Sequence, residues 1–304
     1  MKVTIVGGGG GVGSSVAFNL LIRGLDYDVV LVDPRQDVAA SHVLDLEQTL
    51  EQGAGRSVRV GDDNDLVDSD VVVVAAGAPL TLNTSRLVYL TDHVPVVTHL
   101  ADLLGAGTWT GVLIMVTNPV DPLCTFLHRQ TGLDRRRILG YTLNDSLRLR
   151  TGIGKALGVP PGAVEAWALG EHGDSNVFLF DRVTVAGKPV ELSREEQVAA
   201  EEFARTWYVS AVALNPSRSS TWTSGFGVAR MVDAISRPPG EIWPASVVLA
   251  GEYGIDGVSV SVPVTLGPGG AEEIHEWELS PTDLAALQRS AAFVRELTDS
   301  IEAA

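Results

Sequence analysis

Short apolar runs alternate with longer helix-like stretches over the first half of the chain. A run of about four to eight apolar residues between turn residues is typical of a strand buried on both faces of a parallel sheet. The predicted strands are residues 1–6, 28–33, 71–76 and 112–116, and the predicted helices are 14–23, 40–50 and 94–104. This alternation predicts an α/β fold with a doubly wound parallel sheet.

The second half of the chain follows a different order. The predicted elements are a long helix beginning near residue 144, strands around 164–169 and 178–185, a long helix over 193–212, β segments over 245–252 and 257–263, and an amphipathic helix over 281–301. This mixture is typical of an α+β domain. No low-complexity linker separates the halves. The sequence therefore predicts two domains, residues 1–143 and 144–304, that meet at a packed joint.

Composition and charge narrow the class of protein. The 304 residues carry a net charge of −16 and a hydrophobic fraction of 45%, which excludes a disordered chain. A chain this acidic is not expected to bind nucleic acid or an anionic membrane surface. Its apolar runs are too short for a membrane span, and no charged-then-apolar leader precedes the first strand. We therefore expect a cytoplasmic protein, and its single cysteine, Cys124, rules out an internal disulfide.

A glycine-rich turn connects the first predicted strand to the first predicted helix. Glycines fill residues 7–11, and Val12 and Gly13 follow them. The spacing G-x-G-x-x-G with a helix after it fits Gly8, Gly10 and Gly13. In such a turn the glycines allow a sharp bend, a close approach of the backbone to a pyrophosphate, and packing of the helix on the strand. The pattern predicts a dinucleotide site of the Rossmann type, with the pyrophosphate at the helix N-terminus.

The second predicted strand ends in an acidic residue, Asp33, which lies 20 residues after Gly13. A carboxylate at this place accepts hydrogen bonds from the ribose hydroxyls of the adenosine half and repels a 2′-phosphate. Asp33 therefore favours NAD over NADP as the cofactor. Arg35, two residues further on, would soften that preference.

Two motifs in the second half carry acid–base and anion-binding groups. Asp145 and Arg148 are three residues apart, so they share one face of the predicted helix. His172 follows 27 residues after Asp145, within Gly170-Glu171-His172-Gly173-Asp174. A histidine gives and takes protons near neutral pH, a carboxylate orients it, and a guanidinium binds a substrate carboxylate. Taken alone, a solvated helix followed by a glycine-rich turn explains the same residues.

Several motifs occur together in a fixed order. They are Ala75-Ala76-Gly77-Ala78-Pro79 with Arg86, Thr117-Asn118-Pro119-Val120-Asp121, Asn144-Asp145-Ser146-Leu147-Arg148, and Gly170-Glu171-His172-Gly173-Asp174-Ser175. In these motifs and their spacing the chain resembles the lactate/malate dehydrogenases over nearly its whole length. Residues 257–278 are especially similar to the malate dehydrogenases of halophilic archaea. The resemblance implies a Rossmann NAD-binding domain followed by an α+β substrate domain.

The resemblance also implies roles for these residues. His172 would be the acid–base group, with Asp145 fixing its tautomer and stabilising the imidazolium. Arg148 would bind the substrate carboxylate through two hydrogen bonds, a geometry that lysine does not offer. Arg86, on a loop that closes over the substrate, would polarise the carbonyl. Asn118 would contact the substrate oxygen and the nicotinamide ribose.

The same resemblance implies a further cofactor contact, a pocket residue and an assembly. Gly77 would lie against the cofactor, and Ser220 would line the substrate pocket. Family members pair through a helix of the nucleotide-binding domain, and residues 40–50 are the equivalent segment. We therefore expect a homo-oligomer, either a dimer or a tetramer.

The specificity loop departs from the family pattern. Six residues before the loop arginine, the family has an arginine that reads the second carboxylate of oxaloacetate or a glutamine that suits pyruvate. Here that residue is Leu80. Leucine cannot pair with a carboxylate, and burying that charge without a partner is costly. A 2-hydroxy acid with an uncharged side chain is therefore favoured, unless the altered loop folds so that another residue contacts the substrate.

These observations predict an NAD-dependent oxidoreductase that transfers a hydride between nicotinamide and C2 of an L-2-hydroxy acid, with a lactate-like or larger side chain and no metal. A malate dehydrogenase with an atypical loop is an alternative. Two other classes stay open: a non-catalytic NAD-binding protein and a metal-assisted, NAD-using glycosidase. The glycosidase would need a cysteine or several histidines around the substrate, and the set of Asp145, Arg148 and His172 argues against it.

Overall fold

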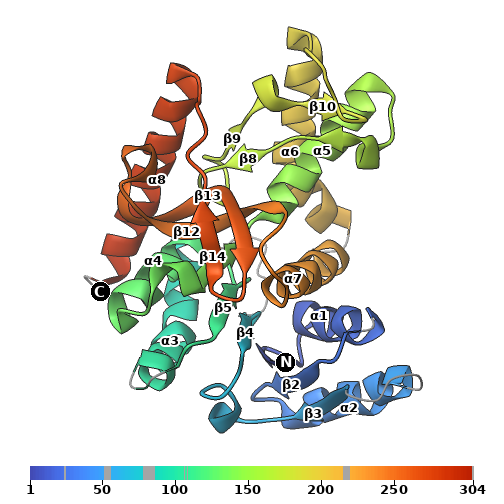
Figure 1. The fold of residues 1–304 in the computed structure, drawn as a ribbon, viewed down its shortest axis with the longest axis vertical. Coiled ribbons are helices and arrows are strands. Elements are labelled where there is room, and N and C mark those ends of the chain that lie inside the picture. Colours follow the sequence, from blue (N-terminus) through green and yellow to red (C-terminus); the bar gives the residue numbers. More distant parts are fainter. Residues whose placement is uncertain are drawn as a thin grey trace.

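The computed structural model describes residues 1–23, 25–50, 56–77, 86–105, 107, 109–214 and 220–302, and for 86–89 and 212 it describes the backbone alone. Within these ranges the chain forms a nine-stranded sheet and two small sheets, with helices packed around the large sheet (Figure 1). No helix in the same ranges is both long and apolar enough to cross a membrane. The cytoplasmic location stays a prediction.

Six parallel strands form one part of the large sheet, in the order β6-β5-β4-β1-β2-β3. They are β1 Lys2–Val6, β2 Asp28–Val32, β3 Ser57–Val60, β4 Val71–Val74, β5 Val112–Met115 and β6 Ile138–Tyr141. The direction in which strands are added reverses at β1, which lies between β2 and β4. In open α/β sheets a ligand binds beyond the carboxyl ends of the strands at such a reversal. The topology therefore places the candidate cofactor site at the end of β1.

Helices cover both faces of this parallel part. The helices of the first half are α1 Gly11–Ile22, α2 Gln36–Leu46, α3 Arg86–Gly105 and α4 Val120–Thr131. The second half adds α5 Leu143–Leu157, α6 Arg194–Leu214, which packs on α5, α7 Thr221–Ile235 and α8 Pro281–Glu302. Val71 and Val73 of β4 belong to the core that includes α1 and α7, which lie side by side (Figure 1). Val72 and Val74 belong to the core under α3 and α4. Burial on both faces explains why β4 is apolar without alternation.

Three antiparallel strands of the second half extend the same sheet. They are β12 Ile242–Ala250, β13 Asp256–Gly267 and β14 Gly270–Ile274. β12 pairs with β6, with Ser246 opposite Gly140. A Cβ at Gly140 would lie 2.6 Å from Ser246 Cβ, so only glycine fits where α4 and β12 both approach β6. The two halves therefore share a continuous sheet, and the boundary at 143/144 stays a prediction.

The predicted α/β class is confirmed, and the differences concern individual elements. The segments predicted as single strands over 164–169 and 178–185 each contain two short strands. These are β7 Val164–Glu165, β8 Ala168–Leu169, β9 Val177–Phe178 and β10 Thr184–Val185. β8 pairs with β9 in one small sheet, whereas β7 pairs with β10, and β10 with β11 Lys188–Pro189, in another. The change of partner sheet interrupts each predicted strand.

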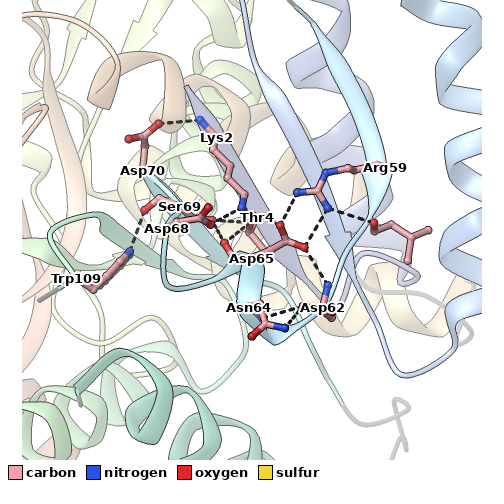
Figure 2. A network of polar contacts seen from close by, with 11 residues as sticks. Lys2, Thr4, Arg59, Asp62, Asn64, Asp65, Asp68, Ser69, Asp70 and Trp109 are labelled. Carbon is pink, nitrogen blue, oxygen red and sulfur yellow. Dashed lines mark hydrogen bonds and ion pairs between the residues drawn. The ribbon is translucent and has the colours of Figure 1, made fainter. Parts of the chain in front are cut away.

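A network of charged side chains joins the amino end of β1 to the turn before β4 (Figure 2). Asp65 accepts a hydrogen bond from Lys2 Nζ at 2.8 Å and accepts from both terminal nitrogens of Arg59, one of them at 3.0 Å. Lys2 also pairs with Asp68, and its backbone N–H donates to Asp70 at 2.7 Å. The hydrogen bonds from Arg59 hold the pKa of Asp65 well below its usual range. One carboxylate therefore links β1, β3 and the turn.

Replacing Asp65 with asparagine is expected to lower the free energy of unfolding by about 1–3 kcal/mol near neutral pH, because Lys2 and Arg59 lose their charged acceptor. A carboxyl group whose pKa is lowered by folding stabilises the protein above its unfolded-state pKa of about 3.9, and this contribution is lost as the pH falls below that value. The difference between the two proteins should therefore shrink on acidification. Urea unfolding followed by circular dichroism, at about pH 7 and about pH 3.5, measures both free energies.

Asp68→Asn is the matched control for this experiment. The Asp68 side chain is 68% exposed, so its loss should change the free energy of unfolding by less than about 0.5 kcal/mol. Equal losses in the two variants would contradict the linking role of Asp65.

Candidate active site

At several positions of the glycine-rich turn between β1 and α1, a side chain would collide with the protein's own chain. Gly7 has a φ of +86°, and a Cβ at Gly13 would lie 2.3 Å from Gly7 O. A Cβ at Gly8 would lie 2.7 Å from Leu31 Cβ. Gly10 is the N-cap of α1, and no side chain caps this helix end. The turn therefore fits a dinucleotide pyrophosphate, which would sit at the N-terminus of α1 as predicted for Gly8, Gly10 and Gly13.

Asp33 lies just beyond β2, beside the glycine-rich turn. Its carboxylate accepts hydrogen bonds from Gly9 N at 2.9 Å, from Arg35 N at 3.0 Å and from Arg35 Nε at 3.1 Å. Burial alone would raise the pKa of Asp33, but these hydrogen bonds outweigh it and hold the pKa below its usual range. Asp33 is therefore ionised at neutral pH and stands where the adenosine ribose of the cofactor is predicted to bind.

Three of the four predicted catalytic residues, His172, Asp145 and Arg148, come together between α5 and the segment after β8. His172 Nδ1 lies 2.6 Å from Asp145 Oδ2, and Arg148 Nη1 lies 3.5 Å from Asp145 Oδ1. Because an ionised carboxylate only accepts hydrogen bonds, Nδ1 carries the proton and Nε2 is left for exchange with a ligand. Burial by itself lowers the pKa of His172, but the charge and hydrogen bond of Asp145 raise it above its usual value. The imidazole is thereby held in the tautomer that proton transfer requires.

The backbone around His172 is fixed by groups to which the sequence assigned no role. His172 N donates to Asp121 Oδ2 at 2.6 Å, and Ser246 Oγ donates to Asp121 Oδ1 at 2.5 Å. Burial raises the pKa of Asp121 to about 7. Glu171 N donates to Ser290 Oγ on α8 at 2.8 Å. The segment that carries Glu171 and His172 is therefore held by α4, β12 and α8. Of these positioning residues, Asp121 could have been noticed in the sequence, because it belongs to the Thr117–Asp121 motif.

Arg148 is stacked on an aromatic side chain of α6. The guanidinium carbon lies 4.5 Å from the ring centroid of Trp207, and its side chain is 17% exposed. Stacking on one face and the contact with Asp145 restrict the plane of the guanidinium. No pattern in the sequence identified Trp207, because it reaches Arg148 only through the packing of α6 against α5.

A pocket of about 440 Å³ joins these groups. Of the predicted site residues, it is lined by Gly77, Asn118, Asp145, Arg148, His172 and Ser220. Ser220 is the N-cap of α7, and Val12 of α1 carries the pocket toward the glycine-rich turn. Leu80 lies outside the described residues, and for Arg86 only its position at the start of α3 is described.

Other lining residues were missed by the sequence analysis. His93 on α3 lies with its Nδ1 2.7 Å from Asn118 O, and since the carbonyl accepts, Nδ1 donates and holds Asn118 in place. Burial lowers the pKa of His93, so it is neutral at neutral pH. Tyr208 also lines the pocket. Its residue type is too common on helices to be singled out from a sequence.

The chain is similar to lactate and malate dehydrogenases over nearly its whole length. The family model described as lactate/malate dehydrogenase, NAD binding domain, matches residues 1–140, and the model described as lactate/malate dehydrogenase, alpha/beta C-terminal domain, matches residues 142–304. The malate dehydrogenase of Halobacterium salinarum is 35% identical over 304 residues, covering 99% of each chain. The L-lactate dehydrogenase 2 of Lactococcus lactis subsp. lactis is 30% identical over 314 residues, covering 99% of this chain and 100% of that one.

A solved structure extends the likeness to the fold. The malate dehydrogenase of Aeropyrum pernix superposes with a TM-score of 0.91 at 28% identity, covering 98% of this chain and 97% of that one. Malate and lactate dehydrogenases thus resemble this chain to a similar degree, and the likeness does not distinguish their substrates. The chain therefore belongs to the lactate/malate dehydrogenase family and is an NAD-dependent oxidoreductase of 2-hydroxy acids.

Proposed function

We propose that the enzyme interconverts an L-2-hydroxy acid whose side chain is uncharged and the corresponding 2-oxo acid. The observation that carries this proposal is the supply of positive charge in the pocket. A dicarboxylate such as oxaloacetate needs one cation for each carboxylate, and Arg148 serves the carboxylate next to the reacting carbon. Whether the substrate can carry a second carboxylate therefore depends on whether the pocket wall offers another cation to pair with it.

Arg205 is the second guanidinium in the described part of the pocket wall, and most of its N–H donors are engaged. Nε donates to Glu201 Oε1 at 2.8 Å, and Nη1 donates to Asp174 O at 2.9 Å and to Asn176 Oδ1 at 3.0 Å. Glu201 also neutralises its charge. A second substrate carboxylate would have to break these bonds or be buried without a partner, and an unpaired buried charge is costly. Leu80, at the specificity position of the sequence, supports the same conclusion.

His172 is the proposed acid–base residue. During reduction of the 2-oxo acid its Nε2 gives a proton to the carbonyl oxygen, and during oxidation it takes the proton of the alcohol. The Asp145 carboxylate stabilises the imidazolium form and keeps Nδ1 protonated. The nicotinamide supplies or accepts the hydride when it is bound.

Arg148, Asn118 and Arg86 are the proposed binding groups. Arg148 offers the substrate carboxylate two parallel N–H groups from a plane set by its aromatic neighbour. Asn118, held through its backbone carbonyl, would contact the substrate oxygen and the nicotinamide ribose. Arg86, as the sequence resemblance implies, would close over the substrate and polarise its carbonyl. Gly77 would lie against the cofactor and Ser220 against the substrate side chain.

A malate dehydrogenase is the second candidate, because malate dehydrogenases are among the most similar relatives. In that case a residue other than Leu80 would bind the second carboxylate. NADH oxidation with oxaloacetate, pyruvate, 2-oxobutyrate, 2-oxoisocaproate and phenylpyruvate, at low and high salt, distinguishes the two candidates. We expect kcat/KM for the best uncharged acid to exceed that for oxaloacetate about 100-fold or more, the cost of burying an unpaired charge.

Variants of Leu80 sharpen this test. Leu80→Arg should raise kcat/KM for oxaloacetate and lower it for the uncharged acids, whereas Leu80→Gln, which adds polarity without charge, should leave oxaloacetate a poor substrate. A strong preference of the unchanged enzyme for oxaloacetate would overturn the proposal and favour the malate dehydrogenase candidate.

The proposed assembly is a homo-oligomer. Large apolar side chains are exposed on neighbouring helices of one flank: Phe18 and Ile22 on α1, Leu44 on α2, and Trp222 and Phe226 on α7. α1 packs against α7 and contacts α2, and exposed large apolar side chains gathered on adjacent helices are typical of a protein interface. Light scattering after gel filtration should give at least twice the chain mass of 32.1 kDa. Leu44→Glu should shift the enzyme toward the mass of one chain, and a wild-type mass of one chain would contradict the assembly.

A further inference from the structure

We propose that the adenosine end of the cofactor site also accepts the 2′-phosphate of NADP(H), with Arg35 as the residue that binds it. The inference concerns cofactor choice alone and does not depend on which 2-hydroxy acid is the substrate. The hydrogen bonds of Asp33, the residue from which a preference for NAD is predicted, leave that preference weak.

The acceptor positions of Asp33 are already occupied. Oδ1 accepts from Arg35 N at 3.0 Å and from Arg35 Nε at 3.1 Å. Oδ2 accepts from Gly9 N at 2.9 Å and lies 3.5 Å from Arg35 Nη2. An ionised carboxylate has about four acceptor positions, so a ribose hydroxyl can bind here only if the Arg35 side chain moves away. The carboxylate that would select NAD is therefore partly satisfied by its own chain.

The ion pair also weakens the repulsion on which NAD selection rests. A lone carboxylate excludes a 2′-phosphate because both groups are negative, whereas Asp33 and Arg35 together carry no net charge. The side chain of Arg35 is 59% exposed and that of Asp33 is 4% exposed. The positive partner thus faces the solvent from which the cofactor arrives, and the negative partner is covered.

Arg35 is the adaptable member of the pair. Asp33 is confined by the glycine-rich turn, since a Cβ at Gly9 would lie 2.9 Å from Asp33 Cγ. Arg35 contacts Asp33 through Nε and Nη2, which leaves the Nη1 donors available on an exposed side chain. A guanidinium binds phosphate oxygens through two parallel hydrogen bonds. Arg35 can therefore swing from the carboxylate to a 2′-phosphate while Asp33 stays in place.

The start of α2 adds a weaker favourable contribution. Arg35 is the N-cap residue of α2, and no side chain caps this helix end. Free backbone N–H groups at a helix N-terminus favour an anion, although the exposed Asp37 in the first turn opposes this effect. The Arg35 guanidinium is therefore the main contributor to the proposed binding of the 2′-phosphate.

Binding of NADH and NADPH without substrate tests the proposal. Titration followed by nicotinamide fluorescence gives both dissociation constants, so the result does not depend on turnover. For the unchanged enzyme we expect the two constants to differ by less than about tenfold. Arg35→Gln should weaken NADPH binding about 10- to 100-fold, the value of one or two charge-assisted hydrogen bonds, and leave NADH binding unchanged or slightly tighter.

Arg136→Gln is the matched control. Arg136 is exposed in the 3₁₀ turn next to β14, at the opposite edge of the large sheet from β2 and β3. Either substitution changes the net charge from −16 to −17, so both alter the overall field equally. NADPH binding that weakens equally in both variants would attribute the effect to net charge and overturn the role of Arg35.

Two probes of the adenosine half complete the test. Adenosine 2′,5′-bisphosphate and adenosine 5′-monophosphate are each used to displace NADH. With the unchanged enzyme the bisphosphate should compete at least as well as the monophosphate. With Arg35→Gln it should compete less well than the monophosphate. NADPH binding more than about 100-fold weaker than NADH binding in the unchanged enzyme, with a ratio insensitive to Arg35→Gln, would overturn the proposal.

Discussion

Replacing His172 with glutamine is expected to lower kcat for 2-oxo acid reduction by about 10²- to 10⁴-fold, the usual contribution of general acid–base catalysis. Glutamine keeps polarity and approximate size but cannot give a proton to the carbonyl oxygen at neutral pH. The dissociation constant of NADH should stay within about twofold, because the proposed contacts of the adenosine half, the glycine-rich turn and Asp33, do not involve His172. Steady-state kinetics and a fluorescence titration of NADH measure the two quantities separately.

His99→Gln is the control for this prediction. His99 is an exposed histidine on α3 that pairs with Asp63 at 2.8 Å and does not line the described pocket. Its replacement should leave kcat within about twofold of the unchanged enzyme. A His172→Gln enzyme that retains more than about a tenth of the wild-type kcat would contradict the assignment of His172 as the acid.

Asp145→Asn separates the charge of the carboxylate from its shape. The amide oxygen can still accept the proton of His172 Nδ1, but the negative charge that raises the pKa of His172 is gone. In the proposed mechanism reduction requires protonated His172, so kcat/KM for the 2-oxo acid should fall as the pH rises through that pKa. In the variant this fall should move to lower pH. A pH profile that keeps its position while activity drops would contradict the electrostatic role of Asp145.

The parallel part of the fold could be predicted because each of its central strands is a short run of apolar residues that is recognisable from the local sequence alone. β4 is four consecutive buried valines, and both faces of the strand are covered by helices. β14, in contrast, has the sequence Gly-Ala-Glu-Glu-Ile and forms because the neighbouring β13 offers its edge. Residues 164–169 were predicted as one strand because local pattern does not show that β7 and β8 join different sheets. Pairing between distant segments decides these elements.

The candidate site likewise contains residues that local spacing predicts and residues that only tertiary contacts identify. Asp145 and Arg148 share a helix turn, so their spacing alone predicts that they lie together. The hydrogen bond from His172 to Asp121 joins residues 51 apart, and no local pattern predicts it. Trp207 is likewise identified only by its contact with Arg148 across two packed helices. Sequence patterns therefore predict the groups with chemical roles, and the side chains that position them emerge from tertiary contacts.

Replacing Arg148 with lysine is expected to raise KM for the 2-oxo acid about 100-fold or more, because one ammonium group cannot reproduce the two parallel charge-assisted hydrogen bonds of a planar guanidinium to the substrate carboxylate. The positive charge is kept, so the loss measures geometry. The ammonium group of lysine is not planar and does not stack on Trp207 as a guanidinium does, so the variant also loses the contact that orients the side chain of residue 148. Steady-state kinetics at saturating NADH, with an uncharged 2-oxo acid, give kcat and KM for each variant.

Variants of Trp207 show whether the stacking itself contributes. Trp207→Phe keeps an aromatic face under Arg148, whereas Trp207→Ala removes it, so KM should rise several-fold in the alanine variant and recover in the phenylalanine variant. Because Trp207 contacts Arg148 and does not line the described pocket, Trp207→Ala should add little to Arg148→Lys when the two are combined. Equal effects of Trp207→Ala in the presence and absence of Arg148 would show that the ring contacts the substrate directly. A near-normal KM for Arg148→Lys would mean that a point charge is sufficient and that the two-bond geometry is not used.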